Sequence, residues 1–166
     1  MYRFIVLFRM QSTGWLLLVL CVLFGIILRG WPLGPVVGGF LVASLLLHEV
    51  GHMLAAAMLG VPVREFGLCL GGAYNRRAFA QSRLDEVLIS AAGPLMNLFL
   101  ALTVVFLPQI GIQLAICNLT LCVVNLLPLP SSDGLRILRV ISHSDVDRGV
   151  IPELSRPCEP ISILSR

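Results

Sequence analysis

Long apolar runs, separated by short polar segments, dominate the chain. Four of them cover residues 15–28 (with flanks reaching from 14 to 31), 34–59, 87–107 and 110–127. The hydrocarbon core of a bilayer is about 30 Å thick, and a helix needs about 20 apolar residues to cross it. The pattern therefore predicts an all-α membrane protein with about four transmembrane helices.

The segment between the second and third runs, residues 60–86, has a different pattern. Its first half contains the apolar, glycine-rich stretch 66–72, which is too short to cross a bilayer. Non-helical backbone is tolerated at membrane depth only where its polar groups are paired or line a cavity. We therefore expect a short membrane-dipping β-hairpin here, followed by a polar surface segment over residues 75–86.

A change of composition near residue 142 marks the end of the predicted core. The last residues are polar, contain Pro152, Pro157 and Pro160, and show no sustained hydrophobic period. Such a segment has too little apolar surface to offset the entropy of folding. We predict a transmembrane core over residues 1–141 and a flexible C-terminal tail over residues 142–166.

The overall composition excludes an ordinary soluble domain. Apolar residues make up 57% of the chain and charged residues only 13%, whereas soluble domains have about 45–50% and 25%. The basic residues form no run interleaved with aromatic residues, so we expect no nucleic-acid partner. A lipid bilayer is the environment that this composition favours.

The arginines predict the orientation of the spans. All twelve basic residues are arginine, and a four-span chain with a cytoplasmic N-terminus places eleven of them in cytoplasmic segments. Only Arg29 then falls on the opposite side. Because cytoplasmic loops carry an excess of basic residues, we expect both termini in the cytoplasm.

The second run contains the pentad His48-Glu49-Val50-Gly51-His52. Residues four apart share one face of a helix, so both imidazoles can bind one ion, and Glu49 lies beside them as a candidate general base. The alternative is a pair of core histidines with a buried glutamate. That alternative must explain three ionisable groups at membrane depth, where each is costly without a partner.

Catalytic zinc has three protein ligands and an open position, so the pentad needs a third ligand. Asp133 is a better candidate than His143, which lies in the polar tail. Asp133 follows two prolines that end the fourth run, and the local pattern taken alone favours an ordinary turn aspartate. The topology favours the ligand, because the second and fourth spans both run toward the cytoplasm.

Asparagines in the last two runs are candidates for binding substrate. Gly93-Pro94 should kink or interrupt the third helix, and Asn97 follows one turn later. Asn97 is suited either to an interhelical hydrogen bond or to donating to a substrate backbone or an oxyanion. In the fourth run we favour a functional role only for Asn125, which lies next to the aspartate segment.

Together these motifs resemble the site-two protease family of intramembrane zinc metalloproteases. His48-Glu49-x-x-His52 is similar to its zinc motif, Gly93-x-x-x-Asn97 to its central motif, and Asn125-x-x-Pro128-x-Pro130-x-x-Asp133-Gly134 to its third-ligand motif. The family commonly has an apolar residue before the aspartate, where this chain has Ser132. The resemblance covers residues 28–140 and is closest to the compact, sporulation-type branch without an inserted PDZ-like domain.

The resemblance implies one zinc ion per chain, held by His48, His52 and Asp133, with Glu49 as the base. It implies that Asn97, Asn125 and Gly93 help to bind substrate or its oxyanion. The family cuts transmembrane segments of other membrane proteins, so the expected partners are a transmembrane substrate and the bilayer. A regulatory membrane partner or a second copy of the chain is also compatible with the family.

Two other functions fit part of the pattern. One is a membrane-anchored zincin that acts on soluble or interfacial peptides; the other is an inactive, metal-binding membrane protein or transporter. A zincin usually takes a downstream helical glutamate as its third ligand. The candidates all fall in predicted loop or tail sequence: Glu65, Glu86, Glu153 and Glu159.

Overall fold

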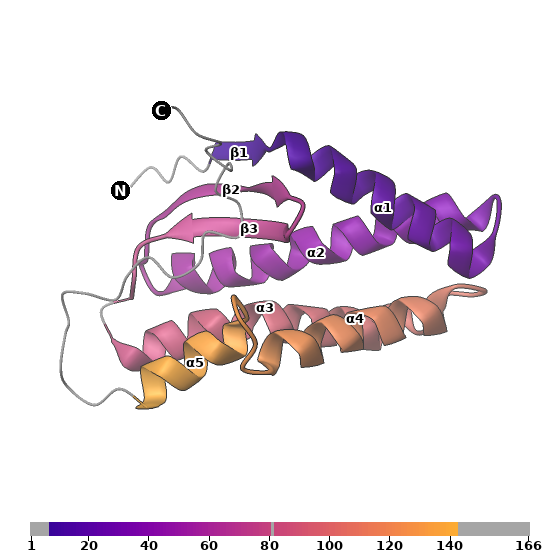
Figure 1. Cartoon of the computed structure of the whole chain (residues 1–166). Helices are drawn as coiled ribbons and strands as arrows, with labels where there is room; N and C mark the ends of the chain where they lie inside the picture. Colours follow the sequence, from indigo (N-terminus) through magenta and orange to yellow (C-terminus); the bar gives the residue numbers. More distant parts are fainter. Residues whose placement is uncertain (1–6, 81, 143–166) are drawn as a thin grey trace, which may run out of the picture.

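The computed structural model describes residues 7–80 and 82–142 (Figure 1). The helices in this part of the chain are α1 (Ser12–Arg29), α2 (Leu33–Met58), α3 (Arg83–Val104), α4 (Gly111–Leu126) and α5 (Asp133–Ser142). The strands are β1 (Leu7–Met10), β2 (Val63–Cys69) and β3 (Gly72–Arg77). The predicted tail beyond residue 142 lies outside the described residues.

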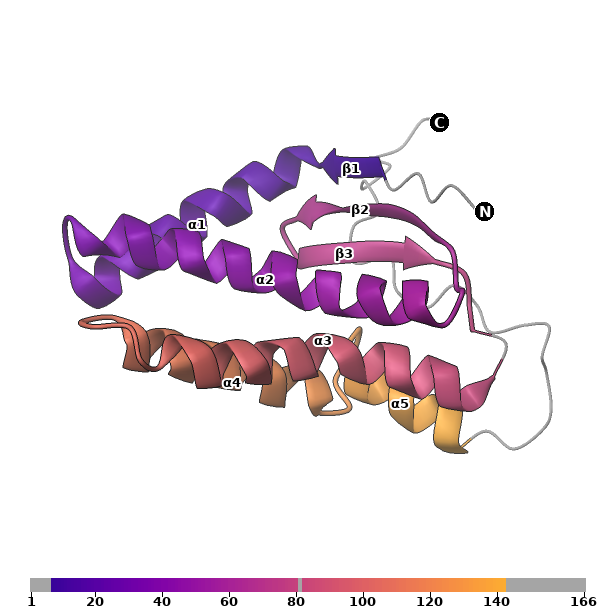
Figure 2. The same cartoon turned by 180° about the vertical axis from the view of Figure 1, so that it is seen from behind.

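The central element is α2, the helix that carries the His-Glu pentad. In both views, α1 and the sheet lie on one side of α2, and α3, α4 and α5 lie on the other (Figures 1 and 2). A small core of Ala56, Val61, Val63 and Ile89 joins the end of α2 to the hairpin and to α3. The pentad is therefore enclosed by secondary structure on two sides.

Three helices are long and apolar enough to cross a membrane: α1, α2 and α3. The fourth predicted span is shorter than expected, because α4 has only 16 residues, or about 24 Å at 1.5 Å per residue. Pro128 and Pro130 follow α4, and proline cannot continue a helix ladder. The chain then resumes as α5, a helix that the sequence pattern did not predict.

The sheet is larger than the expected hairpin. β2 and β3 form an antiparallel hairpin between α2 and α3, and Gly72 turns the chain with a φ of +120°. β1 adds in parallel to the other edge of β2, giving the order β1-β2-β3. Gly67 permits this pairing, since a Cβ there would lie 2.9 Å from the Tyr74 hydroxyl and closer still to the Arg9 carbonyl. The all-α prediction is therefore too narrow.

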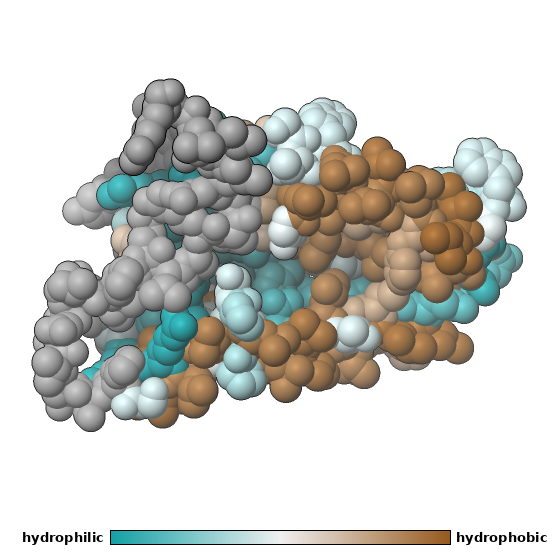
Figure 3. Space-filling view, in the orientation of Figure 1, coloured by the Kyte–Doolittle hydropathy of each residue, from teal (hydrophilic) through white to brown (hydrophobic). Residues whose placement is uncertain are grey.

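Large apolar side chains cover the outside of the helices. Ile27, Trp31, Met58 and Phe106 are each at least 80% exposed, and Figure 3 shows broad hydrophobic surface over α1 and α4. A soluble monomer rarely exposes a contiguous apolar surface of this extent. The surface is the one expected of helices that face lipid.

The segment after β3 is less exposed than predicted. Glu86, expected at the surface, is 4% exposed. Its carboxylate accepts hydrogen bonds from both terminal nitrogens of Arg77, at 2.8 and 2.6 Å, and from the Ala80 N–H at 3.0 Å. A buried carboxylate requires such partners. The pair joins the end of β3 to the first turn of α3 and so fixes the hairpin against the helices.

Replacing Arg77 with methionine should destabilise the protein, because it leaves the Glu86 carboxylate buried without its cation. Breaking a buried pair in this way costs about 3–5 kcal/mol. The matched control is Arg76→Met, since the Arg76 side chain is 46% exposed and its pair with Glu65 spans 3.4 Å; an exposed pair contributes about 1 kcal/mol or less. Thermal unfolding in detergent compares the two, and equal losses would contradict a structural role for the buried pair.

Candidate active site

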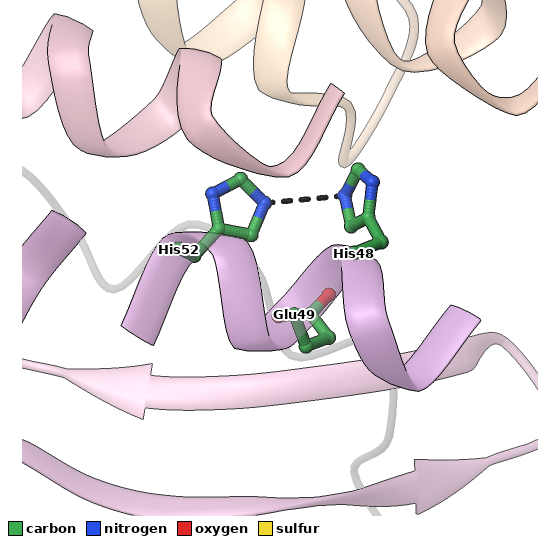
Figure 4. A group of neighbouring side chains, drawn as sticks. All are labelled: His48, Glu49 and His52. Atoms are coloured by element: carbon green, nitrogen blue, oxygen red, sulfur yellow. Dashed lines mark hydrogen bonds between the residues drawn. The ribbon is translucent and has the colours of Figure 1, made fainter. Parts of the chain in front are cut away.

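His48 and His52 lie one turn apart on the face of α2 that points toward α3 and the segment before α5 (Figure 4). Both are buried, and their rings meet edge to face with centroids 4.8 Å apart. Their Nε2 atoms are 3.1 Å apart. The helical spacing therefore brings the two ligand nitrogens together, as the sequence predicts.

Asp133, the first residue of α5, completes the cluster from a distant part of the chain. Its Oδ2 lies 3.2 Å from Nε2 of His48 and 3.2 Å from Nε2 of His52. Ligands at 2.0–2.1 Å in a tetrahedral zinc site are separated by about 3.3–3.4 Å. The two nitrogens and the carboxylate oxygen thus occupy three positions that fit one zinc ion.

The hydrogen bond behind His52 also fits a metal ligand. Its Nδ1 lies 2.6 Å from the carbonyl oxygen of Ile89 on α3. A carbonyl can only accept, so Nδ1 carries the proton and the lone pair of Nε2 faces the cluster. Such a carbonyl contact is the usual way to fix the tautomer and orientation of a metal-binding imidazole.

Gly93 of α3 packs directly against both imidazoles. A Cβ at this position would lie 2.7 Å from Nε2 of His48, 2.5 Å from Cε1 of His52 and closer still to Nε2 of His52. Any side chain would therefore enter the space between the donor atoms. Steric room for the cluster accounts for this glycine, whereas the prediction that it binds substrate stays a prediction.

Pro94 does not interrupt α3, contrary to one of the two outcomes predicted for Gly93-Pro94. The helix runs without a break from Arg83 to Val104. Proline removes its own N–H from the ladder and its ring crowds the carbonyl four residues earlier, so the close packing of α3 on α2 must offset this cost. Gly51 of α2 permits this packing, since a Cβ there would lie 2.7 Å from the Ala92 carbonyl.

Glu49 lies on the same helix but has a partner from the sheet. Its ligand oxygen is within 4.8 Å of the two histidine nitrogens, and its Oε2 accepts a hydrogen bond from the amide of Asn75 on β3. Asn75 is not predictable from the sequence, because nothing in the hairpin pattern shows which strand residue faces α2. The hairpin therefore supplies a side chain to the site.

The two candidate asparagines differ in their surroundings. Asn97 is fully buried, and neither polar atom of its amide has a partner among the described residues. A buried amide without partners costs about 1–3 kcal/mol per unsatisfied group, and the prediction that Asn97 binds substrate stays a prediction. Asn125 instead donates to the Leu121 carbonyl of its own helix at 2.9 Å.

Comparison with known proteins agrees with this geometry. The profile of Peptidase family M50 matches residues 39–113. A solved structure of the Site-2 Protease from Methanocaldococcus jannaschii superposes with a TM-score of 0.67 and 26% identity, over 85% of this chain and 69% of that one. In sequence and in fold, the chain is similar to the site-two protease family.

Two bacterial relatives are each named a putative zinc metalloprotease. One is sll0528 of Synechocystis, 34% identical over 122 residues, which are 67% of this chain and 32% of the relative. The other is YwhC of Bacillus subtilis, 35% identical over 116 residues, or 57% and 52% of the two chains. The chain thus spans about a third to a half of these relatives. The family that it resembles is one of zinc metalloproteases, and its long apolar helices make it a multi-pass integral membrane protein.

The structure corrects one argument about the third ligand. Glu86, assigned to a loop by the sequence analysis, lies in the first turn of α3. A helical glutamate is therefore present downstream of the pentad, as the zincin alternative requires. However, both oxygens of Glu86 are bound by Arg77, whereas the carboxylate of Asp133 faces the two histidines.

Gly93→Ala should lower the zinc content of the purified protein about tenfold or more, a loss of the size seen when groups that support metal ligands are altered. The new methyl group would occupy the space between the imidazoles. Gly39→Ala on α2 is the matched control, because a Cβ there meets open space. Metal analysis of both variants tests this, and zinc at the wild-type level in Gly93→Ala would contradict the proposed position of the ion.

Proposed function

We propose that this chain is an intramembrane zinc endopeptidase that cleaves membrane proteins within or near their transmembrane segments. The observation that carries the proposal is the meeting of His48, His52 and Asp133 beside Glu49, inside helices with an apolar exterior. One zinc ion per chain would be held by the two imidazoles and the aspartate. The connection between α2 and α3 holds only the β-hairpin, which supports the compact branch without a PDZ-like insertion.

The bound zinc ion would polarise the scissile carbonyl and acidify the attacking water. Glu49 takes the proton of that water and delivers it to the leaving amine. The amide of Asn75 holds the Glu49 carboxylate in place during both transfers. In this proposal Asn97 donates to the oxyanion, which is where a preorganised donor has its largest effect on rate.

The site lies well inside the helix bundle. His52 precedes the end of α2 by six residues and His48 by ten, or about 9 and 15 Å along the axis. The arginine distribution orients this end of α2, and with it the site, toward the cytoplasm. Arg29 donates to the Gln109 carbonyl, so the loops assigned to the opposite side meet at the other end of the bundle.

An extended substrate could dock on β3. The carbonyls of a helical segment are occupied by i to i−4 hydrogen bonds, so the substrate must unwind before attack. β2 is paired on both sides, whereas β3 has one edge that pairs with no strand of the described sheet. A substrate strand added to β3 would lie beside Asn75, and thus close to Glu49.

The fourth crossing would be made by α4 and the segment 127–132, with α5, which carries Arg136 and Arg139, toward its cytoplasmic end. Figures 1 and 2 show α5 continuing the course of α4 along α3. Interrupted helices are tolerated in membranes where the freed backbone groups are bonded within the protein. This arrangement places the interruption next to the histidines.

The test is cleavage of a model single-span substrate by protein in liposomes. Glu49→Gln should retain zinc but cleave about 10²–10⁴-fold more slowly, because the amide cannot accept the proton. Cleavage by the wild type of a soluble peptide but not of the span would favour the zincin alternative. Bound zinc without cleavage of either substrate would favour an inactive metal-binding protein.

Asp133→Ala should also remove most of the zinc, since the ion would keep only the two imidazoles. Metal analysis at matched protein concentration measures the loss. Asp85→Ala is the comparison, because Asp85 lies in the first turn of α3 and is not part of the cluster. Full zinc retention by Asp133→Ala would instead favour a site completed by another carboxylate.

A further inference from the structure

The interruption between α4 and α5 determines where Asp133 lies. α4 ends at Leu126, α5 begins at Asp133, and the intervening residues include two prolines that have no N–H to donate. Because Asp133 contacts both histidines, this irregular segment runs at the depth of the site. Its polar backbone groups therefore need partners within the protein.

Ser132 supplies three of those partners through one hydroxyl group. Its Oγ donates to the Leu127 carbonyl at 2.5 Å and accepts from the N–H groups of Leu129 and Leu135, each at 3.1 Å. A serine hydroxyl has one donor and two acceptor positions, so its capacity is fully used. One side chain thus connects the end of α4, the middle of the interruption and the first turn of α5.

Ser132 is also the residue immediately before the predicted metal ligand. It occupies the N-cap position of α5, and Leu135 is the third helical residue, so the bond from the Leu135 N–H is a standard N-cap contact. The helix that Ser132 caps therefore starts at Asp133. When the first turn of α5 is fixed, the Asp133 carboxylate can move only by rotation about its own side-chain bonds.

Close packing limits how α5 can move if this cap is lost. A Cβ at Gly134 would lie 2.8 Å from the Leu127 carbonyl and closer still to that of Leu126. The start of α5 thus rests directly on the end of α4. Metal–ligand distances tolerate changes of only about 0.2 Å, so a small shift of this turn is enough to weaken the site.

We propose that Ser132 is a positioning residue, which sets the Asp133 carboxylate for metal binding through the hydroxyl contacts that join α4 to α5. The proposal rests on the proposed function, in which Asp133 is the third ligand. The family commonly has an apolar residue at this position, and an apolar side chain can make none of the three bonds. This way of positioning the aspartate therefore depends on a serine that replaces the apolar residue common in the family.

The experiment measures the zinc dissociation constant of the full chain in detergent by competition with a chelator. Ser132→Ala should weaken zinc binding about 10- to 100-fold, the usual effect of losing a group that orients a ligand. Ser132→Thr, which keeps a hydroxyl, should recover most of the affinity. Ser131→Ala is the matched control, because the Ser131 side chain makes no hydrogen bond within the described residues, and it should stay within about twofold of wild type.

A double-mutant cycle separates positioning from general destabilisation. If Ser132 acts through Asp133, then Ser132→Ala should cause no further loss of affinity in an Asp133→Ala background. A merely structural role would weaken binding by the same factor in both backgrounds and would overturn the proposal. Wild-type affinity in Ser132→Ala would overturn it too, while leaving the proposed function intact.

A second variant keeps the test decisive if Ser132→Ala does not fold. Glycine is a well-tolerated N-cap, so Ser132→Gly removes the hydroxyl with little loss of helix stability, and it should weaken zinc binding to a similar extent. Wild-type affinity in Ser132→Gly would overturn the proposal. Wild-type affinity in Asp133→Ala alone would overturn the ligand assignment, and with it both the proposed function and the role of Ser132.

Discussion

The contact of Asp133 with His48 and His52 is the interaction on which the arrangement of the surrounding helices depends. Three groups that donate lone pairs lie within 3.2 Å of one another in a buried position, an arrangement that a cation would stabilise. Two of them come from one face of α2, but the third comes from a helix that begins more than 80 residues later. Folding must therefore bring α2, α3 and α5 into a single relative position.

Several features of the chain follow from that requirement. Gly93 lets α3 approach the imidazoles, and the Ile89 carbonyl of the same helix orients His52. The interruption after α4 starts a new helix at the aspartate. On the other side of α2, the hairpin contributes Asn75 to Glu49, and the Arg77–Glu86 pair joins that hairpin to α3. The proposed metal ligands and the proposed base are thus supported from opposite sides of one central helix.

The sequence was most informative where the predicted feature depends on residues that are close together in the chain. The spacing of His48 and His52 needs only the helical period, and apolar length was enough to predict α1, α2 and α3. Asp133 was found because the arginines assign a common side to two distant spans. In contrast, Asn75 gains its partner from a tertiary contact, and Glu86 and Ser132 gain theirs from irregular segments, so none of the three leaves a periodic signal. β1 was not predicted because it has only four residues. α5 was not predicted because it follows two prolines, which indicate the end of a helix.

X-ray absorption spectroscopy of the zinc-loaded protein tests the central claim most directly, because it reports the atoms bound to the metal. We expect a four-coordinate zinc ion with two imidazole nitrogens and oxygen donors at about 2.0–2.2 Å. A sulfur shell near 2.3 Å, or a single imidazole, would contradict this expectation. Either result would mean that the meeting of His48, His52 and Asp133 does not form the metal site.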